Sequence, residues 1–170
     1  MSKKFRGAVV AIGLLLAGCY SSDQPALEKG EWAPLAGKFS CDVPGMGASE
    51  FVEQKNGWIF SDYTYRSPTG EALLAKKIGD KLYLAQAKSG GKPYSYLYLD
   101  FVTENAFVVL APNVASKGPY IEILAKKYEI QSSSGAGGSI KLTGAQANLL
   151  AFLSAHDRPL TTALGTCKKA

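Results

Sequence analysis

The chain has 170 residues, of which 46% are hydrophobic, and it carries a formal net charge of +5. This length suits one domain with a substantial core. Lys3, Lys4 and Arg6 supply three of the 19 basic side chains, which leaves 16 basic against 14 acidic side chains in residues 19–170. Because these charges form no clustered basic stripe, the sequence argues against nucleic-acid binding.

Residues 1–18 have the three parts of a secretory signal. The positive region is followed by an apolar run over 8–16, and Ala17 and Gly18 precede Cys19. The apolar run is shorter than the roughly 20 residues that a bilayer-spanning helix needs. We therefore expect cleavage before Cys19.

The tetrad Leu-Ala-Gly-Cys at 16–19 resembles the lipobox of bacterial lipoproteins, which signal peptidase II cuts. In that family the thiol of the cysteine receives a diacylglycerol, and cleavage leaves this cysteine as the first residue of the mature chain. The lipid then holds the protein on a membrane. Tyr20 follows the cysteine, where aspartate favours the inner membrane in enterobacteria. The resemblance therefore implies the outer membrane and leaves the leaflet open. The alternative is an ordinary signal peptide with a chance cysteine after it.

Cys41 and Cys167 remain as an even pair once Cys19 is assigned to the lipid. An exported chain meets an oxidising compartment, where such a pair favours a disulfide. The bridge would close a loop of 126 residues (167 − 41), which stabilises the fold by about 5 kcal/mol in the chain-entropy model. Two free thiols or a metal pair are the alternatives, although no histidine cluster supports a metal.

Residues 19–34 are polar and rich in structure breakers, so we expect a tether there and a single disulfide-stapled domain over 35–170. Seven segments of the domain have strand patterns and are separated by turn signals such as Asn56-Gly57. They are 35–43, 49–54, 58–66, 71–78, 81–88, 94–102 and 106–111. Their short connections predict a mainly β (α+β) fold, in which an antiparallel meander gains a second layer or closes into a small barrel.

The last third combines helical and strand patterns. One or two helical turns are expected within 120–128, followed by a hairpin around the glycine-rich loop 132–138. The clearest helix is 143–156, where Thr143 and Gln146 form a capping-box pattern. We expect this helix to pack on the sheet. The tail after it is expected to form a last strand that brings the two remaining cysteines together.

His156 is the only histidine and stands next to Asp157. It could act as a general base, but a histidine in the last turn of a helix can also hydrogen-bond the terminal carbonyls. We favour this capping or surface role. The sequence contains no serine elbow, phosphate loop or metal motif, so it predicts no enzymatic activity, cofactor or metal.

Tyr94, Tyr96 and Tyr98 alternate within the segment 94–102, so their rings are expected to share one face of the sheet. The apolar residues between and after them would form the buried face. Tyrosine joins a large apolar contact to a polar tip and is enriched at interfaces. The rings predict a binding surface for a protein or another envelope component, with at least two rings accessible or lining a pocket. The alternative is an aromatic ladder that only stabilises the sheet.

Three stretches are similar to the membrane-bound lysozyme inhibitors: Phe-Ser-Cys-Asp at 39–42, the run from Leu to Tyr at 82–94, and a cysteine near the C-terminus. The resemblance implies a lipoprotein β-barrel, a disulfide between its first and last strands, and a serine/glycine loop ending in tyrosine that enters the lysozyme cleft. Ser89, Lys92 and Tyr94 are the positions that would make this contact. The chain departs from that family in its greater length, its added helix and its lack of a second inhibitory motif.

The sequence thus predicts an outer-membrane lipoprotein that acts without catalysis, as a binding or envelope-assembly module. An inhibitor of a wall-lytic enzyme such as lysozyme is the first alternative. A hydrolytic enzyme that depends on His156 is the second.

Overall fold

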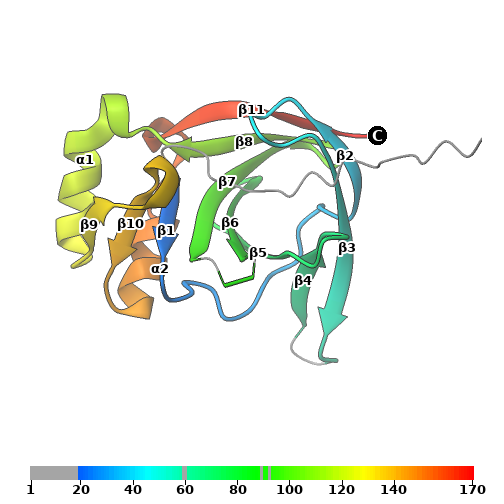
Figure 1. Cartoon of the computed structure of the whole chain (residues 1–170), viewed down its shortest axis with the longest axis horizontal. Helices are drawn as coiled ribbons and strands as arrows, with labels where there is room; N and C mark the ends of the chain where they lie inside the picture. The colour runs from blue at the N-terminus through cyan, green and yellow to red at the C-terminus, as the bar shows by residue number, and fades with distance from the viewer. Residues whose placement is uncertain (1–18, 59–60, 89, 92) are drawn as a thin grey trace, which may run out of the picture.

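Eight antiparallel strands close into a barrel in the computed structural model of the chain (Figure 1). The structure describes residues 19–58, 61–88, 90–91 and 93–170. The barrel strands are β2 (Gly37–Cys41), β3 (Ala48–Asn56), β4 (Asp62–Arg66), β5 (Ala72–Lys77), β6 (Leu82–Lys88), β7 (Tyr94–Thr103), β8 (Ala106–Pro112) and β11 (Thr161–Lys169). Strands β2 to β8 pair in chain order, and β11 closes the ring by pairing with both β8 and β2.

The barrel confirms the predicted meander, because each of the seven expected segments overlaps one of the strands β2 to β8. Gly57 and Gly70 adopt left-handed backbone (φ +86° and +87°) after β3 and β4, a conformation that glycine adopts without strain. The third segment was expected to begin at 58, but β4 begins at Asp62. Residues 59 and 60 lie outside the described residues.

The inner face of the barrel is apolar because side chains alternate along each strand. In β7, Leu97, Leu99 and Phe101 are buried in this core, as predicted. They share the interior with Phe39, Phe51, Tyr65, Tyr83, Phe107 and Val109. An apolar cavity of about 30 Å³ lies among these side chains. It has room for about one or two water molecules, so the side chains around it are closely packed.

A second layer covers the outer face of β6 and β7 (Figure 1). Its elements are β1 (Tyr20–Ser22), β9 (Gln131–Ser134), β10 (Ile140–Thr143), α1 (Val114–Lys127), α2 (Gln146–Ser154) and the short 3₁₀ turns η1 (Ala136–Gly138) and η2 (Arg158–Leu160). β1 pairs with the first half of β7 and with β10, which pairs with β9. A second apolar core fills the space between the layers and includes Tyr20, Leu84, Leu142, Leu149, Phe152 and Leu153. The predicted packing of the C-terminal helix is therefore confirmed.

The segment 19–34 is packed on the barrel, so the expected tether is wrong. The Gln86 side chain accepts hydrogen bonds from the backbone N–H groups of Ala26 and Leu27, and it donates one to the Leu27 carbonyl. The Tyr65 hydroxyl accepts from the Ala33 N–H and donates to the Ala33 carbonyl, both at 2.7 Å. Two buried polar side chains of the barrel thus satisfy backbone groups that a tether would expose to water.

Both helices differ from the expectation at their N-termini. α1 begins at Val114, six residues before the expected turns, because the Asn113 side chain caps it by accepting from the Ser116 N–H. The capping box on α2 is wrong. Thr143 ends β10 and pairs with Gln131, so it is too far from the start of the helix to cap it.

The expected disulfide between Cys41 and Cys167 is present. The two residues lie directly opposite each other on β2 and β11, so the bridge joins the first and last strands of the barrel. In the part of the chain that the structure describes, no helix is both long and apolar enough to cross a membrane.

Candidate functional site

Tyr96 and Tyr98 lie on the predicted face of β7, but both are 0% exposed. The Tyr96 hydroxyl hydrogen-bonds the Ser22 hydroxyl at 2.7 Å and accepts from the Ala26 N–H at 3.0 Å. The Tyr98 hydroxyl donates to the Leu153 carbonyl of α2 at 3.1 Å. The expectation that at least two of the rings are accessible or line a pocket is therefore wrong. β1 and α2 cover the rings that β7 presents on this face.

Tyr94 is the one tyrosine of the three that stays partly exposed. It begins β7, one position beyond the Ala87–Ser95 pair that ends the β6–β7 ladder. The Lys88 ammonium lies 4.2 Å from the centre of the Tyr94 ring and donates to its hydroxyl at 2.9 Å. A cation over an aromatic face is stabilised by the ring quadrupole. We call the segment from Lys88 to Tyr94 the Tyr94 loop.

The Tyr94 loop contains the three positions that the sequence singled out as an inhibitory contact. Ser89 and Lys92 lie outside the described residues. Gly90 adopts left-handed backbone (φ +54°), which helps the chain to reverse between β6 and β7. The pair of Lys88 and Tyr94 at the base of the loop was missed in the sequence. The signal was present, because a hairpin of this length places residues at its two ends opposite each other.

His156 is enclosed between the two layers, with 2% of its surface exposed. Its Nδ1 lies 3.0 Å from the Phe152 carbonyl, which can only accept, so Nδ1 carries the proton. Nε2 then accepts from the Tyr20 hydroxyl at 3.0 Å. The Tyr98 ring stacks on the imidazole with 5.6 Å between the ring centres.

Burial lowers the pKa of His156 to about 4, so the imidazole is neutral at pH 7. The expected hydrogen bond to a terminal carbonyl of the helix is confirmed, whereas the expected surface position is wrong. The residue is buried because Tyr20, from the segment assigned to a tether, lies across it. This enclosure leaves His156 almost no accessible surface.

Cys19 is also buried, at 2% exposure. Because Tyr20 pairs with Tyr96 and faces the second core, Cys19 faces the barrel interior on the side of Leu97. Burial raises the pKa of its thiol to about 12. Among the described residues, no group of three or more His, Cys, Asp or Glu side chains is placed to hold a metal ion.

A second exposed feature lies on α1. Tyr120 and Ile123 are each 66% exposed, and their spacing of three residues places them side by side on the helix. The Lys117 ammonium lies 5.9 Å from the centre of the Tyr120 ring. Large apolar side chains that remain in water as a pair are candidates for contact with another molecule.

Comparison of the chain with protein-family models, with curated proteins and with solved structures gives no match.

Proposed function

We propose that the protein is a lipid-anchored binding protein of the bacterial outer membrane, that it acts without catalysis, and that the Tyr94 loop is its binding element. One observation carries the choice of the loop. Of the three tyrosines on the outer face of β7, two hold the layers together through their hydroxyl groups, and Tyr94 alone keeps an accessible surface. Accessible tyrosine side chains are typical contact residues of interfaces.

A wall-lytic glycosidase such as lysozyme is the partner that this proposal favours. The chain forms a barrel whose first and last strands are joined by a disulfide, two features implied by the resemblance to the membrane-bound lysozyme inhibitors. The clefts of glycosidases contain a pair of carboxyl groups. The Tyr94 loop offers lysine ammonium and serine hydroxyl groups as donors to carboxylates, and a tyrosine ring as an apolar contact. Binding of the Tyr94 loop in the cleft would prevent the wall polysaccharide from entering the active site of the glycosidase.

The exposed pair on α1 favours a second candidate function, an envelope-assembly module that contacts a protein through Tyr120 and Ile123. The two candidates use different elements, β6–β7 and α1, and so can be separated by single substitutions. Each tyrosine serves as the matched control for the other.

The test measures lysozyme activity on cell walls, and lysozyme affinity by calorimetry, with the full mature protein. Tyr94→Ala is expected to weaken binding by about tenfold or more, the loss of a hot-spot side chain, while Tyr120→Ala leaves it unchanged. Equal affinity of wild type and Tyr94→Ala would contradict a role for the loop. Absence of inhibition by the wild-type protein would exclude lysozyme as its target. The assembly function is tested by chemical cross-linking of the protein to its neighbours in cell envelopes. Loss of a cross-linked partner in Tyr120→Ala, but not in Tyr94→Ala, would favour this function.

A further inference from the structure

The first strand of the fold begins one residue after the proposed lipid site. Tyr20, Ser21 and Ser22 are all buried and lie between β7 and β10. The Tyr20 ring packs on Phe152 with 5.5 Å between the ring centres, and its hydroxyl bonds His156. A mature chain that starts at Cys19 therefore has no flexible segment between its first residue and its core. By comparison, a flexible linker of about fifteen residues would allow a separation of roughly 20 Å.

The apolar cavity inside the barrel is too small for the lipid. Cys19 faces this interior, but the cavity of about 30 Å³ is far smaller than a diacylglycerol. A lipidated side chain must therefore turn outward. The Cys19 carbonyl accepts from the Ile140 N–H at 2.8 Å, and rotation about the Cα–C bond of Cys19 moves its side chain and amine without moving that carbonyl. Because cleavage leaves nothing before Cys19, this rotation moves no residue on its N-terminal side.

The surface beside Cys19 carries little net charge. No charged residue occurs between Glu129 and Lys141, a stretch made mainly of serine, glycine and alanine. Its end is aligned with β1, since Ile140 pairs with Tyr20 and the Ser139 hydroxyl lies 3.2 Å from the Ser21 hydroxyl. The nearby ammonium of Lys141 is paired with Asp23 at 2.6 Å.

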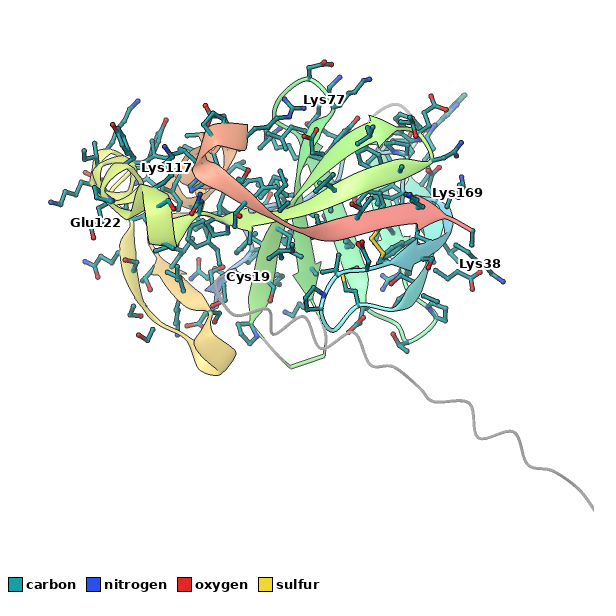
Figure 2. The ribbon with its side chains drawn as sticks, turned by 90° about the horizontal axis from the view of Figure 1, so that it is seen from above. Cys19, Lys38, Lys77, Lys117, Glu122 and Lys169 are labelled. Carbon is teal, nitrogen blue, oxygen red and sulfur yellow. A yellow bond between two sulfur atoms is a disulfide. The ribbon has the colours of Figure 1, made fainter. Side chains whose placement is uncertain are left out.

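We call Cys19 together with residues 131–140 the anchor face. β9 lies two strand spacings from β1, about 10 Å away, so the whole anchor face lies close to the lipid site. Figure 2 shows Cys19 between the barrel and α1, whereas Lys38 and Lys169 lie at the opposite end of the barrel. Small uncharged residues can approach lipid headgroups closely without the cost of desolvating a charge.

We propose that the lipid holds the domain directly against the bilayer, with the anchor face toward the headgroups and in one fixed orientation. This inference rests on the proposed lipid anchor. Its consequence is that the Tyr94 loop is held within one domain diameter of the membrane. The loop can therefore reach partners at the membrane surface and none deep in the cell wall.

The test uses the lipidated protein, purified from membranes and reconstituted in vesicles of phosphatidylethanolamine and phosphatidylglycerol. A nitroxide label is placed on Ser133→Cys, in the anchor face, or on Val52→Cys. Val52 is an exposed position of β3, on the side of the ring opposite β7. The label at 133 is expected to lose accessibility to a water-soluble nickel chelate and gain accessibility to oxygen, relative to the label at 52. Melting temperatures check that both variants fold.

A linker variant supplies the control. An insert of Tyr followed by about fifteen Gly and Ser residues between Cys19 and Tyr20 keeps the residue after the lipid site and frees the domain. It should restore nickel accessibility at 133 while the lipid, measured by mass spectrometry, remains. Equal accessibility at 133 and 52 in a lipidated protein without the insert would overturn the fixed orientation and leave the anchor standing. A mature protein without lipid on Cys19 would overturn both proposals.

Discussion

Tyr20 of the first strand forms a hydrogen bond with His156, which lies two residues beyond the end of α2. The bond requires a neutral imidazole, since Nε2 must accept from the Tyr20 hydroxyl while Nδ1 donates to the Phe152 carbonyl. Burial is the main reason that the pKa of His156 falls, and it outweighs the opposite effects of the Phe152 carbonyl and Asp157. The protonated state is thus disfavoured in the folded chain.

We expect stability to fall as the pH is lowered from about 6.5 through 4. In this window the unfolded chain binds a proton at His156 and the folded chain does not. The difference between the pKa values of 6.5 and about 4 corresponds to about 3 kcal/mol of unfolding free energy. Urea unfolding at pH 7 and pH 4 measures this loss. His156→Gln should reduce it, and an identical pH dependence in both proteins would contradict the assignment.

Tyr96 carries a structural hydroxyl group and Tyr94 does not, although both lie on β7. We expect Tyr96→Phe to lower the unfolding free energy by about 1–3 kcal/mol, because it removes a buried partner of Ser22 and Ala26. Tyr94→Phe loses only a partly exposed bond to Lys88 and should cost much less. Urea denaturation of the two variants compares these positions. Equal losses would show that the buried hydroxyl has no special role.

At the scale of elements, the disulfide joins β2 and β11 where they are already paired as strands. Its contribution comes mainly from the open chain, whose loop of 126 residues it restricts. We expect Cys41→Ala with Cys167→Ala to lower the unfolding free energy by about 2–5 kcal/mol and to lower Tm, with the barrel retained. A reductant should lower the Tm of the wild type and leave the double variant unchanged. Equal Tm values before and after reduction would show that the bridge contributes nothing.

Local signals made the barrel predictable, and long-range contacts explain what was missed. Strands β2 to β8 have alternating side chains and turn residues between them, so each hairpin is encoded within a short stretch. β1 has no such signal, because Tyr-Ser-Ser lacks alternation and its partners on β7 and β10 lie far along the chain. Gln86 was the available clue, since a buried glutamine in an apolar strand needs backbone partners, and these lie at 26 and 27.

The Tyr94 loop was identified from the sequence because it is a short local motif. Which of the three tyrosines remains accessible could not be predicted. The answer depends on α2 and β1, which come from opposite ends of the chain and meet only in the folded molecule.

At the scale of the whole molecule, the last strand completes the barrel. Removal of residues 161–170 would leave β2 paired only with β3 and β8 paired only with β7, and it would expose the interior between the two free edges. We expect the truncated chain to lose its cooperative thermal transition and its near-ultraviolet dichroism. Removal of Ala170 alone, which deletes one backbone bond to Lys38, should preserve both. A cooperative transition in the longer truncation would show that seven strands suffice.

This closure also sets a time order for a chain that emerges with its N-terminus first. β2 cannot pair with β11, and β1 cannot pair with β10, until the later strand of each pair has been synthesised and released. Neither layer is therefore complete until nearly the whole chain has emerged. Until then the apolar faces of β6, β7 and β8 have no cover, and such surfaces attract chaperones, proteases and other unfinished chains. The completed protein is compact and cross-linked, but its nascent form passes through a long vulnerable interval. Substitutions that slow the arrival or pairing of β11 would then reduce the yield of protein more than they reduce the stability of the molecules that fold.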